Sequence, residues 1–328
     1  MQKINPRRLF VKNMIKGIAF TSSLTSLSKV FANQPKKVVG NKNIKIGIIG
    51  AENSHTAAFG KLFNVDKIFP DIEVGYVWGE TEAFARVAAQ KGNIPNIVNE
   101  PIDMLGKIDA LIVDHRHGKY HLEAAMPFLE QRIPMFIDKP FCYRRKKGEE
   151  FLSKARELNT PVTSYSSIAH SYETFDIKNQ LSEIESKQNL MMYGPIDLNS
   201  KYGGVFFYGP HLIEPLIYII DSMAIKVRVN RNNASGSANI IFDNGTFATL
   251  IFSIKNRGWQ TFVETKSGFV ELKPSVNKRV PSKSDLDMVT MFKTGKEPRE
   301  HKSIIHGIAI LEALEKSSIS GQWEDIEL

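Results

Sequence analysis

The chain has 328 residues, of which 42% are hydrophobic and 24% are charged, an ordinary balance for a globular protein. Its net charge of +8 is concentrated at the N-terminus, because six of the 43 basic residues and none of the 35 acidic residues lie within residues 1–32. The remainder, at about +2, argues against a nucleic-acid-binding protein, and the single cysteine, Cys142, excludes an internal disulfide framework.

The first 32 residues resemble an export signal. The basic segment "NPRRLFVK" (5–12) precedes a weakly apolar stretch that ends with small-residue cleavage spacing at Val30 and Ala32. This arrangement is similar to a twin-arginine signal, so we expect a signal peptide over 1–32, a linker over 33–43 and an exported, periplasmic protein. The stretch is too polar for a stable membrane span, since Ser, Thr and Lys residues interrupt it. A disordered basic N-terminus is the alternative.

From residue 44 on, apolar runs alternate with amphipathic segments that have helical spacing. The expected strands are "IKIGIIG" (44–50), "IEVGYVWG" (72–79), "DALIVD" (109–114), "IPMFIDKP" (133–140) and "PVTSYSS" (161–167). The expected helices are "TEAFARVAAQKG" (81–92), a part of "KYHLEAAMPFLEQR" (119–132) and "RRKKGEEFLSKARELN" (144–159). Such alternation is typical of parallel βαβ units. It predicts a Rossmann-like, dinucleotide-binding domain with a parallel sheet over residues 44–165.

The second half of the chain has the patterns of an antiparallel α/β region. Strands are expected over "KVRVNRN" (226–232), "SANIIFDNGTFATLIFSI" (237–254) and "GFVELKP" (268–274), and apolar helices over "HLIEPLIYIIDSM" (211–223) and "SIIHGIAILEALEKSS" (303–318). The turn at Asp243, Asn244 and Gly245 divides the longest strand segment into a hairpin. We therefore expect an α/β fold with a second domain over residues 166–328.

The turn after the first strand, "GAENSH" (50–55), departs from the dinucleotide-binding fingerprint GxGxxG. Gly50 is kept, but Glu52 and His55 stand where the other two glycines belong, and an acid at this place repels a pyrophosphate. Ser54 or its neighbour Asn53 can cap the following helix and leave its amides available for an anion. The second strand ends "VWGE", so the acid expected to bind the ribose, Glu80, comes one place late.

The most specific signal is "FIDKPFC" (136–142), at the end of the fourth expected parallel strand, where α/β folds bind ligands. It resembles the EKP motif of the glucose-fructose oxidoreductase, inositol dehydrogenase and MocA (Gfo/Idh/MocA) family, with Asp138 in place of glutamate before Lys139 and Pro140. The resemblance implies that Lys139 lies beside the nicotinamide and the substrate hydroxyl and assists proton transfer. A carboxylate beside a partly buried lysine tunes its acid–base behaviour.

A second stretch, "YGGVFFYGPHLIEPLIYIID" (202–221), is similar to the part of the family in which an aspartate precedes a catalytic histidine by four residues. His211 matches the histidine, whereas Phe207 stands at the position of the aspartate. The resemblance makes Tyr208, three residues before the histidine, a candidate proton donor instead, since some family members use a catalytic tyrosine.

The resemblance extends from about residue 44 to the C-terminus. It implies a Rossmann domain joined to an α/β domain with an open, mainly antiparallel sheet, with NAD or NADP as the cofactor. It also implies that copies of the chain pair through that sheet into a homo-oligomer. By the same resemblance, the substrate is expected to contact Tyr165, His170 and Lys201 at the domain junction.

The segment "DHRHGKYH" (114–121) follows a parallel strand and therefore lies near the same edge of the sheet. In the family this loop packs on the cofactor, so Asp114 and Arg116 are expected to contact it. The spacing also allows a metal site, formed by His115, His117 and His121.

These patterns predict an exported NAD(P)-dependent oxidoreductase of a sugar, polyol or related carbohydrate, with Lys139, His211 and Tyr208 as catalytic residues. The residues expected to bind the cofactor are Gly50, Ser54, His55, Glu80, Asp114, Arg116, Asp138 and Pro140. Two alternatives keep the same fold. One is a non-redox lyase, epimerase or hydrolase-like enzyme assisted by a metal at the three histidines, and the other is a non-catalytic carbohydrate-binding protein.

Overall fold

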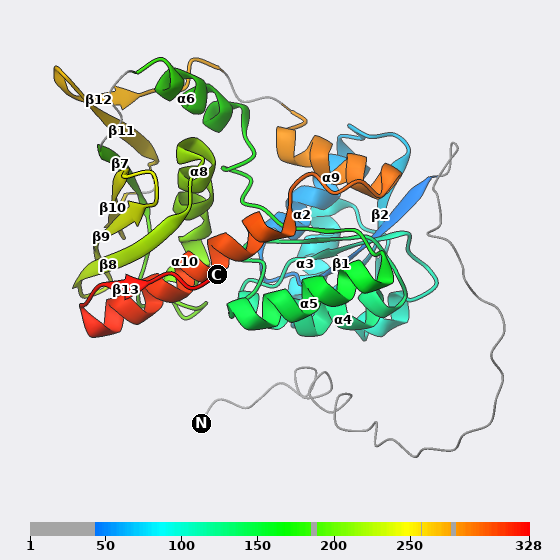
Figure 1. Cartoon of the computed structure of the whole chain (residues 1–328). Coiled ribbons are helices and arrows are strands. Elements are labelled where there is room, and N and C mark those ends of the chain that lie inside the picture. Colours follow the sequence, from blue (N-terminus) through cyan, green and yellow to red (C-terminus); the bar gives the residue numbers. More distant parts are fainter. Residues whose placement is uncertain (1–42, 185–188, 257, 277–279) are drawn as a thin grey trace.

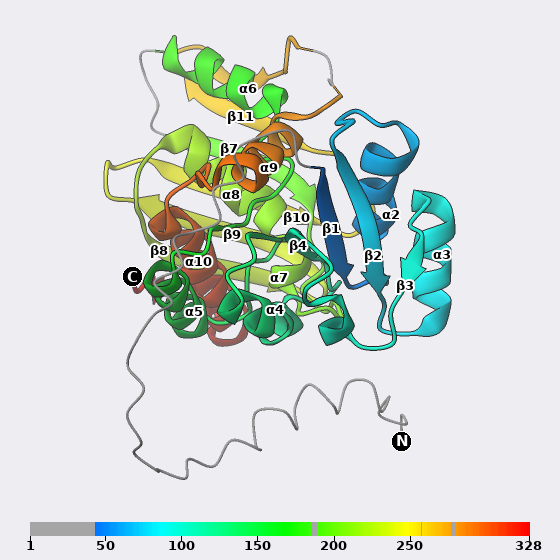
Figure 2. The same cartoon turned by 90° about the vertical axis from the view of Figure 1, so that its right-hand side faces the viewer.

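The computed structural model describes residues 43–184, 189–256, 258–276 and 280–328, and it divides them between two sheets with their helices (Figure 1, Figure 2). The expected signal peptide over 1–32 lies outside the described residues, so export stays a prediction. Within those four ranges, no helix combines the length and the apolarity needed to cross a membrane.

The first sheet has six parallel strands in the spatial order β3-β2-β1-β4-β5-β6, which confirms the expected parallel α/β domain. The strands are β1 Ile44–Ile49, β2 Ile72–Trp78, β3 Asn96–Ile97, β4 Ala110–Val113, β5 Met135–Ile137 and β6 Val162–Thr163. The helices are α2 Ser54–Gly60 with a π-helical turn over Lys61–Val65, α3 Glu82–Gly92, α4 His121–Glu130 and α5 Arg145–Leu158. Short 3-10 turns cover Pro101–Met104 and Gly118–Tyr120.

Both faces of this sheet are buried, which explains why its central strands are continuous apolar runs. Ile48 and Ile112 point to one face, and Val113 and Ile137 point to the other, where they pack in the same core as residues of α4 and α5. The helix α3 begins after Thr81, whose hydroxyl accepts a hydrogen bond from the amide of the third helical residue, as an N-cap does.

The second sheet has seven strands in the order β12-β11-β7-β10-β9-β8-β13, and β7 pairs with β10 as its one parallel pair among the described strands. The strands are β7 Asn189–Pro195, β8 Ala224–Asn232, β9 Ser235–Phe242, β10 Phe247–Ser253, β11 Gln260–Thr265, β12 Gly268–Leu272 and β13 Glu324–Asp325. The helices of this half are α6 Tyr172–Ser182, α7 Val205–Tyr208, α8 Pro210–Ile220, α9 Lys283–Thr294 and α10 His301–Ser320. The mainly antiparallel sheet expected for the C-terminal half is therefore confirmed.

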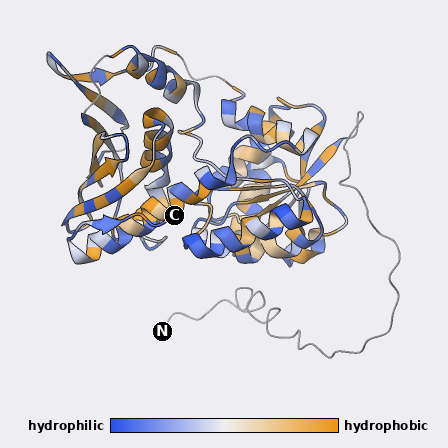
Figure 3. Cartoon of the chain, in the orientation of Figure 1, coloured by the Kyte–Doolittle hydropathy of each residue, from blue (hydrophilic) through white to orange (hydrophobic). Residues whose placement is uncertain are grey.

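The helix α8 is apolar along most of its length, as Figure 3 shows, because it is buried between the second sheet and the rest of the protein. The helix α9 belongs to the C-terminal half of the sequence but packs on the first sheet. Its residues Met288, Met291 and Phe292 share a core with Ile46 and Ile48 of β1.

The adjacent strands β1, β4 and β5 end at one edge of the first sheet. The turns that follow them start at Gly50, Asp114 and Asp138, so these three residues are brought together although they are far apart in the sequence. The short helix α7 and the start of α8 come from the second half of the chain to the same edge, because Lys139 contacts the rings of Phe207 and Tyr208. This edge is the candidate functional site.

Candidate active site

Gly50 forms a tight turn at the end of β1 that only glycine fits. Its φ is +111°, and a Cβ atom at this position would lie 2.6 Å from the backbone of Asp114 and His115. Asn53 caps the following helix by accepting a hydrogen bond from the amide of His55, while Ser54 is the exposed first residue of α2. The turn thus keeps the first glycine of the fingerprint and its helix cap.

The carboxylate of Glu80 reaches back to this turn and occupies two of its amides. Its Oε2 accepts hydrogen bonds from the amides of Ala51 and Glu52 at 2.8 and 2.9 Å, and its Oε1 lies 2.9 Å from Nδ1 of His115. Burial alone raises the pKa of Glu80, but the hydrogen bond and charge of His115 and the amide of Ala51 outweigh burial and lower the pKa to about 2. Glu80 is therefore an ionised group fixed at the turn.

A cavity of about 280 Å³ opens beside this turn. Its lining includes Glu52, Glu80, His115, Arg116, Lys119, Lys201 and Tyr202. The guanidinium of Arg116 lies 4.4 Å from the ring centroid of Tyr202, and the hydroxyl of Tyr202 donates a hydrogen bond of 2.7 Å to Glu52. These contacts join the two halves of the chain across the cavity, and three cationic side chains face its interior.

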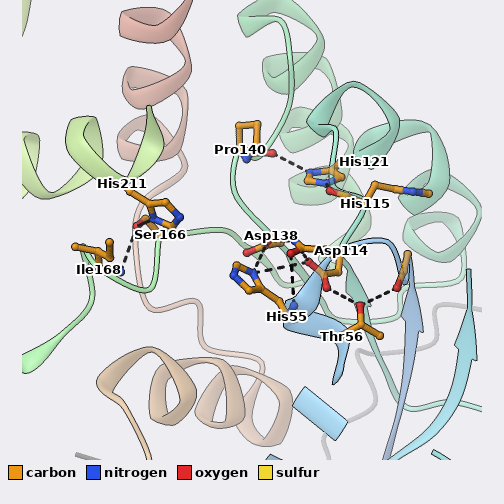
Figure 4. Close-up of polar contacts among 12 residues, drawn as sticks. His55, Thr56, Asp114, His115, His121, Asp138, Pro140, Ser166, Ile168 and His211 are labelled. Atoms are coloured by element: carbon orange, nitrogen blue, oxygen red, sulfur yellow. Dashed lines mark hydrogen bonds and ion pairs between the residues drawn. The ribbon is translucent and has the colours of Figure 1, made fainter. Parts of the chain in front are cut away.

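Next to the cavity, two carboxyl groups are buried against each other at the ends of β4 and β5 (Figure 4). The side-chain nitrogen of Asn53 donates to Asp114 at 2.7 Å and to Asp138 at 3.1 Å. Nδ1 of His55 lies 2.9 Å from Asp138 and 3.9 Å from Asp114. One amide and one imidazole from the turn after β1 therefore bind a pair of carboxyl groups from two other strands.

The hydrogen bonds of Thr56 indicate which of the two carboxyl groups carries a proton. The hydroxyl of Thr56 lies 2.8 Å from the carbonyl oxygen of Gly50 and 2.6 Å from Oδ2 of Asp114. A hydroxyl has only one proton to donate, so both contacts are satisfied when Asp114 is protonated and donates to Thr56, which donates to Gly50. Burial and the charge of Asp138 raise the pKa of Asp114 well above its ordinary range, in agreement with this assignment.

Asp138 is the ionised member of the pair. Burial raises its pKa, but the charges of His55 and Lys139 and the hydrogen bond from His55 outweigh burial and hold the pKa well below its ordinary range. In turn, the charge of Asp138 raises the pKa of His55, against burial and the opposing charge of Lys139. The cluster at neutral pH is thus a protonated Asp114 beside an Asp138–His55 ion pair.

Lys139 is buried next to this ion pair, with an exposed fraction of 5%. Its Nζ lies 5.4 Å from the ring centroid of Phe207 and 5.7 Å from that of Tyr208, and within the described residues it makes no hydrogen bond or ion pair. Cation–π contacts of this length stabilise an ammonium that is removed from water. The structure thus holds the lysine of the DKP motif as a cation whose N–H groups are available to a ligand.

His211 faces the same space from α8 and is in a different electrostatic state from His55 (Figure 4). Its Nδ1 lies 2.7 Å from Oγ of Ser166, and its ring is buried. Burial and the charges of Lys139 and His55 lower the pKa of His211 well below its ordinary value, so the ring is neutral.

The sequence did not indicate Ser166 or Thr56 as site residues, because a single hydroxyl in a polar run is too common to be informative.

The alternative metal site that the histidine spacing allowed is not formed, because the side chains of His115, His117 and His121 bind separate partners. Both ring nitrogens of His121 lie on backbone carbonyl oxygens, those of Pro140 and His115, at 2.8 and 2.7 Å. His115 binds Glu80, and His117 accepts a hydrogen bond from the amide of Lys119. Among the described residues, the one group with ligand spacing is His55, Asp114 and Asp138, but the side-chain nitrogen of Asn53 already lies on both carboxyl groups of that group.

Two of the three expected substrate contacts have packing roles instead. Tyr165 is 2% exposed and donates a hydrogen bond to the carbonyl oxygen of Ser284 in α9. The ring of His170 stacks on Tyr165 at 4.5 Å and lies 3.5 Å from Asp287 of the same helix. Both residues hold α9 in place, whereas the third expected contact, Lys201, does line the cavity.

Comparison with known proteins agrees with this architecture. A profile of the Gfo/Idh/MocA family, described as an oxidoreductase family with an NAD-binding Rossmann fold, matches residues 44–166. The family description thus names the cofactor class that the sequence predicts. No match was found among curated proteins.

Several solved structures share the fold over most of the chain. GenD2 from gentamicin A biosynthesis, in complex with NAD, has a TM-score of 0.74 and 12% identity, covering 91% of this chain and 100% of its own. The myo-inositol 2-dehydrogenase of Lactobacillus plantarum has a TM-score of 0.73 and 15% identity, with coverages of 87% and 100%. The myo-inositol dehydrogenase of Lactobacillus casei, in complex with NAD(H) and myo-inositol, has a TM-score of 0.70 and 13% identity, with coverages of 87% and 97%. At these identities the likeness establishes the fold.

The assigned protonation states predict opposite responses to two isosteric substitutions. Asp114→Asn is expected to change the free energy of unfolding by less than about 1 kcal/mol, because an amide can donate to Thr56 as the protonated carboxyl does. Asp138→Asn is expected to cost about 3 kcal/mol, because it leaves buried cations without their counter-charge. Urea denaturation at neutral pH measures both values. Equal costs for the two variants, or a larger cost for Asp114→Asn, would show that the proton is misassigned.

Proposed function

The N-terminal domain of this chain, residues 44–166, belongs to the Gfo/Idh/MocA family of NAD-binding oxidoreductases, and on this basis we propose that the protein oxidises or reduces a sugar, polyol or related carbohydrate with a nicotinamide dinucleotide. The observation that carries the proposal is the placement of Lys139. It is a buried cation with no anionic partner within ion-pair distance among the described residues, at the edge of the sheet where three strand ends and α8 meet. The myo-inositol dehydrogenases among the similar folds support a polyhydroxylated substrate.

The residues beside the first turn fit a dinucleotide in a modified way. Gly50 keeps the tight turn, and Glu80, although one place late, lines the cavity as an ionised acceptor suited to ribose hydroxyl groups. Glu80 occupies two backbone amides that would otherwise bind a pyrophosphate. The phosphates are therefore expected to bind the cationic side chains that line the cavity, those of Arg116, Lys119 and Lys201. These cations also offset the charge of Glu52.

In the proposed reaction Lys139 is the acid–base residue. Its ammonium donates a hydrogen bond to the oxygen of the reacting carbon and stabilises negative charge that develops on this oxygen. The rings of Phe207 and Tyr208 hold the ammonium and exclude water from it. When bound, the nicotinamide supplies the hydride acceptor or donor. The neutral ring of His211 is suited to orient a second hydroxyl of the substrate.

We also propose that copies of the chain pair through the second sheet. The helices α8 and α10 cover one of its faces, and no described helix covers the other (Figure 1). Tyr193 of β7 and Ile251 of β10 are neighbours on that open face and are only partly buried in the single chain. Apolar and aromatic side chains on a sheet face that no helix covers are typical of an interface between identical subunits.

Replacing Lys139 tests the catalytic assignment. In Lys139→Met, turnover of a polyol panel that includes myo-inositol is expected to fall by a factor on the order of 10²–10⁴, since a positioned proton-transfer group is lost. The affinity for NAD⁺ is expected to change only a few-fold. NADH absorbance measures turnover and calorimetry measures binding, with Lys154→Met on the outer surface of α5 as the matched control. Unchanged turnover in Lys139→Met would contradict the role of this lysine.

The position of Glu80 predicts a preference for NAD over NADP. An ionised carboxylate beside the ribose repels a 2′-phosphate, so NAD⁺ is expected to bind at least about tenfold more tightly than NADP⁺. Glu80→Gln is expected to reduce this ratio, whereas Glu73→Gln, on the preceding strand β2 and more than half exposed, leaves it unchanged. Calorimetric titration with both dinucleotides checks the result. Tighter binding of NADP⁺ by the wild type would rule out this role of Glu80.

Substitution on the open face of the second sheet tests the proposed pairing. Ile251→Arg is expected to convert the oligomer to a monomer, because it places a charge in a contact between apolar surfaces. Ile319→Arg, at an 81% exposed position of α10, is expected to leave the oligomer intact. Light scattering coupled to gel filtration gives the mass of each variant. A wild-type chain that is monomeric at high concentration would exclude the interface.

A further inference from the structure

We propose that His55 is the group that exchanges the reaction's proton with solvent, through Lys139. The inference rests on the proposed oxidoreductase function. In the oxidation direction, Lys139, which makes no direct hydrogen bond to His55, passes an ammonium proton through a bridging water to Nε2 of His55 and then takes the proton of the substrate hydroxyl. When bound, the oxidised nicotinamide would accept the hydride of the breaking C–H bond, so that a carbonyl group and an imidazolium of His55 remain. Reduction reverses each transfer.

The orientation of His55 suits this task. Its Nδ1 is bound to Asp138 at 2.9 Å, while its Nε2 has no hydrogen-bond partner in the described part of the chain. The side chain is 35% exposed, whereas the two carboxyl groups beneath it are at most 5% exposed. A carboxylate that holds one nitrogen of an imidazole fixes its tautomer and stabilises its protonated form, and the other nitrogen stays available for proton transfer. His55 thus connects the buried cluster with solvent.

Three of the departures of this chain from the family pattern come together at this point. His55 stands where the fingerprint has its third glycine, and its ring contacts Asp138, the replacement in the DKP motif, which a glycine could not do. Phe207 stands where an aspartate would precede His211, so this histidine is bound by the hydroxyl of Ser166 instead of a carboxylate. Of His55 and His211, the histidine paired with an acid is therefore His55, supplied by the Rossmann domain.

The charges around the two histidines assign them different roles. The groups that face His55 are Asp138 and Asp114 at the strand ends, Lys139, and His211 from α8. The charge of Asp138 outweighs burial and the charge of Lys139 and raises the pKa of His55 above its ordinary value, so this ring holds a proton that it can release as the pH rises. His211 is buried beside two cations and stays neutral. The neutral ring of His211 can donate or accept a hydrogen bond, but it does not take up the proton released in the reaction.

The position of Lys139 couples its charge to that of His55. Both cations lie beside the carboxylate of Asp138, so removal of one strengthens the hold of this carboxylate on the other. In Lys139→Met the pKa of His55 is therefore expected to rise further, and in Asp138→Asn it is expected to fall. NMR titration of the protein with ¹³C-labelled histidine measures these shifts without any substrate. A pKa of His55 that does not respond to either substitution would contradict the relay.

The pH profile of kcat/KM for NAD⁺ reduction tests the catalytic part, with myo-inositol and a panel of other polyols as probes. Because oxidation requires neutral His55, the wild-type rate is expected to rise with pH through an ionisation above the ordinary histidine value of about 6.5. In His55→Asn, which keeps a donor for Asp138, the rate is expected to fall about 100-fold and this ionisation to disappear. His211→Asn is expected to keep the ionisation at a lower rate.

Added imidazole is expected to restore activity to His55→Ala, which a purely structural role would not allow. An unchanged ionisation in His55→Asn, or no rescue of His55→Ala, would overturn the proposal. Thermal denaturation of both variants verifies that they are folded.

Calorimetry with NAD⁺ distinguishes a failure of the proposed oxidoreductase function from a failure of the role of His55. A wild type that binds no dinucleotide contradicts the proposed function itself, whereas an active wild type with a profile independent of His55 contradicts only the role of this histidine.

Discussion

The buried charge of Asp138 is the interaction on which the centre of this protein depends. A carboxylate with an exposed fraction of 4% is tolerated only when cations and hydrogen-bond donors replace water around it. Asn53 and His55 supply them from the turn after β1, and Lys139 supplies a second positive charge from the adjacent residue. The strand end, the turn and the lysine are therefore held in one arrangement, in which neighbouring Asp114 has to stay protonated.

In the proposed dinucleotide site, side chains replace the glycine amides as the groups that bind an anion. In the usual fingerprint, glycines let the backbone approach a pyrophosphate closely. Here the carboxylate of Glu80 occupies two of those amides, and the cavity beside them is lined by Arg116, Lys119 and Lys201. A turn with Glu52 and His55 is thus compatible with a dinucleotide-binding family, because cationic side chains can replace the contacts that the backbone has lost.

Neither half of the chain builds the site alone. Lys139, His55 and Asp138 come from the first sheet, but the aromatic faces that hold the ammonium and the neutral His211 come from α7 and α8. The hydrogen bond between Tyr202 and Glu52 closes the same junction on the cavity side. Because α9 returns to pack on the first sheet, the two halves are also joined through an apolar core. The relative position of the two domains therefore determines the geometry around Lys139.

The parallel strands, most of the helices and the place of Lys139 could be predicted from the sequence, since these follow from local periodicity, caps and a short motif. The sequence identified Glu80 but not its contacts, it predicted that Tyr165 and His170 contact the substrate, and it left open an alternative metal site at the three histidines. Those residues depend on partners far along the chain: Glu80 meets a turn 29 residues away, His55 meets Asp138 across 83 residues, and Tyr165 meets Ser284 across 119. Only the tertiary structure decided these pairs, and with them which acid is charged and which histidine can carry a proton. The physical reason is that burial and neighbouring charges set a protonation state, and neither is a property of the local sequence.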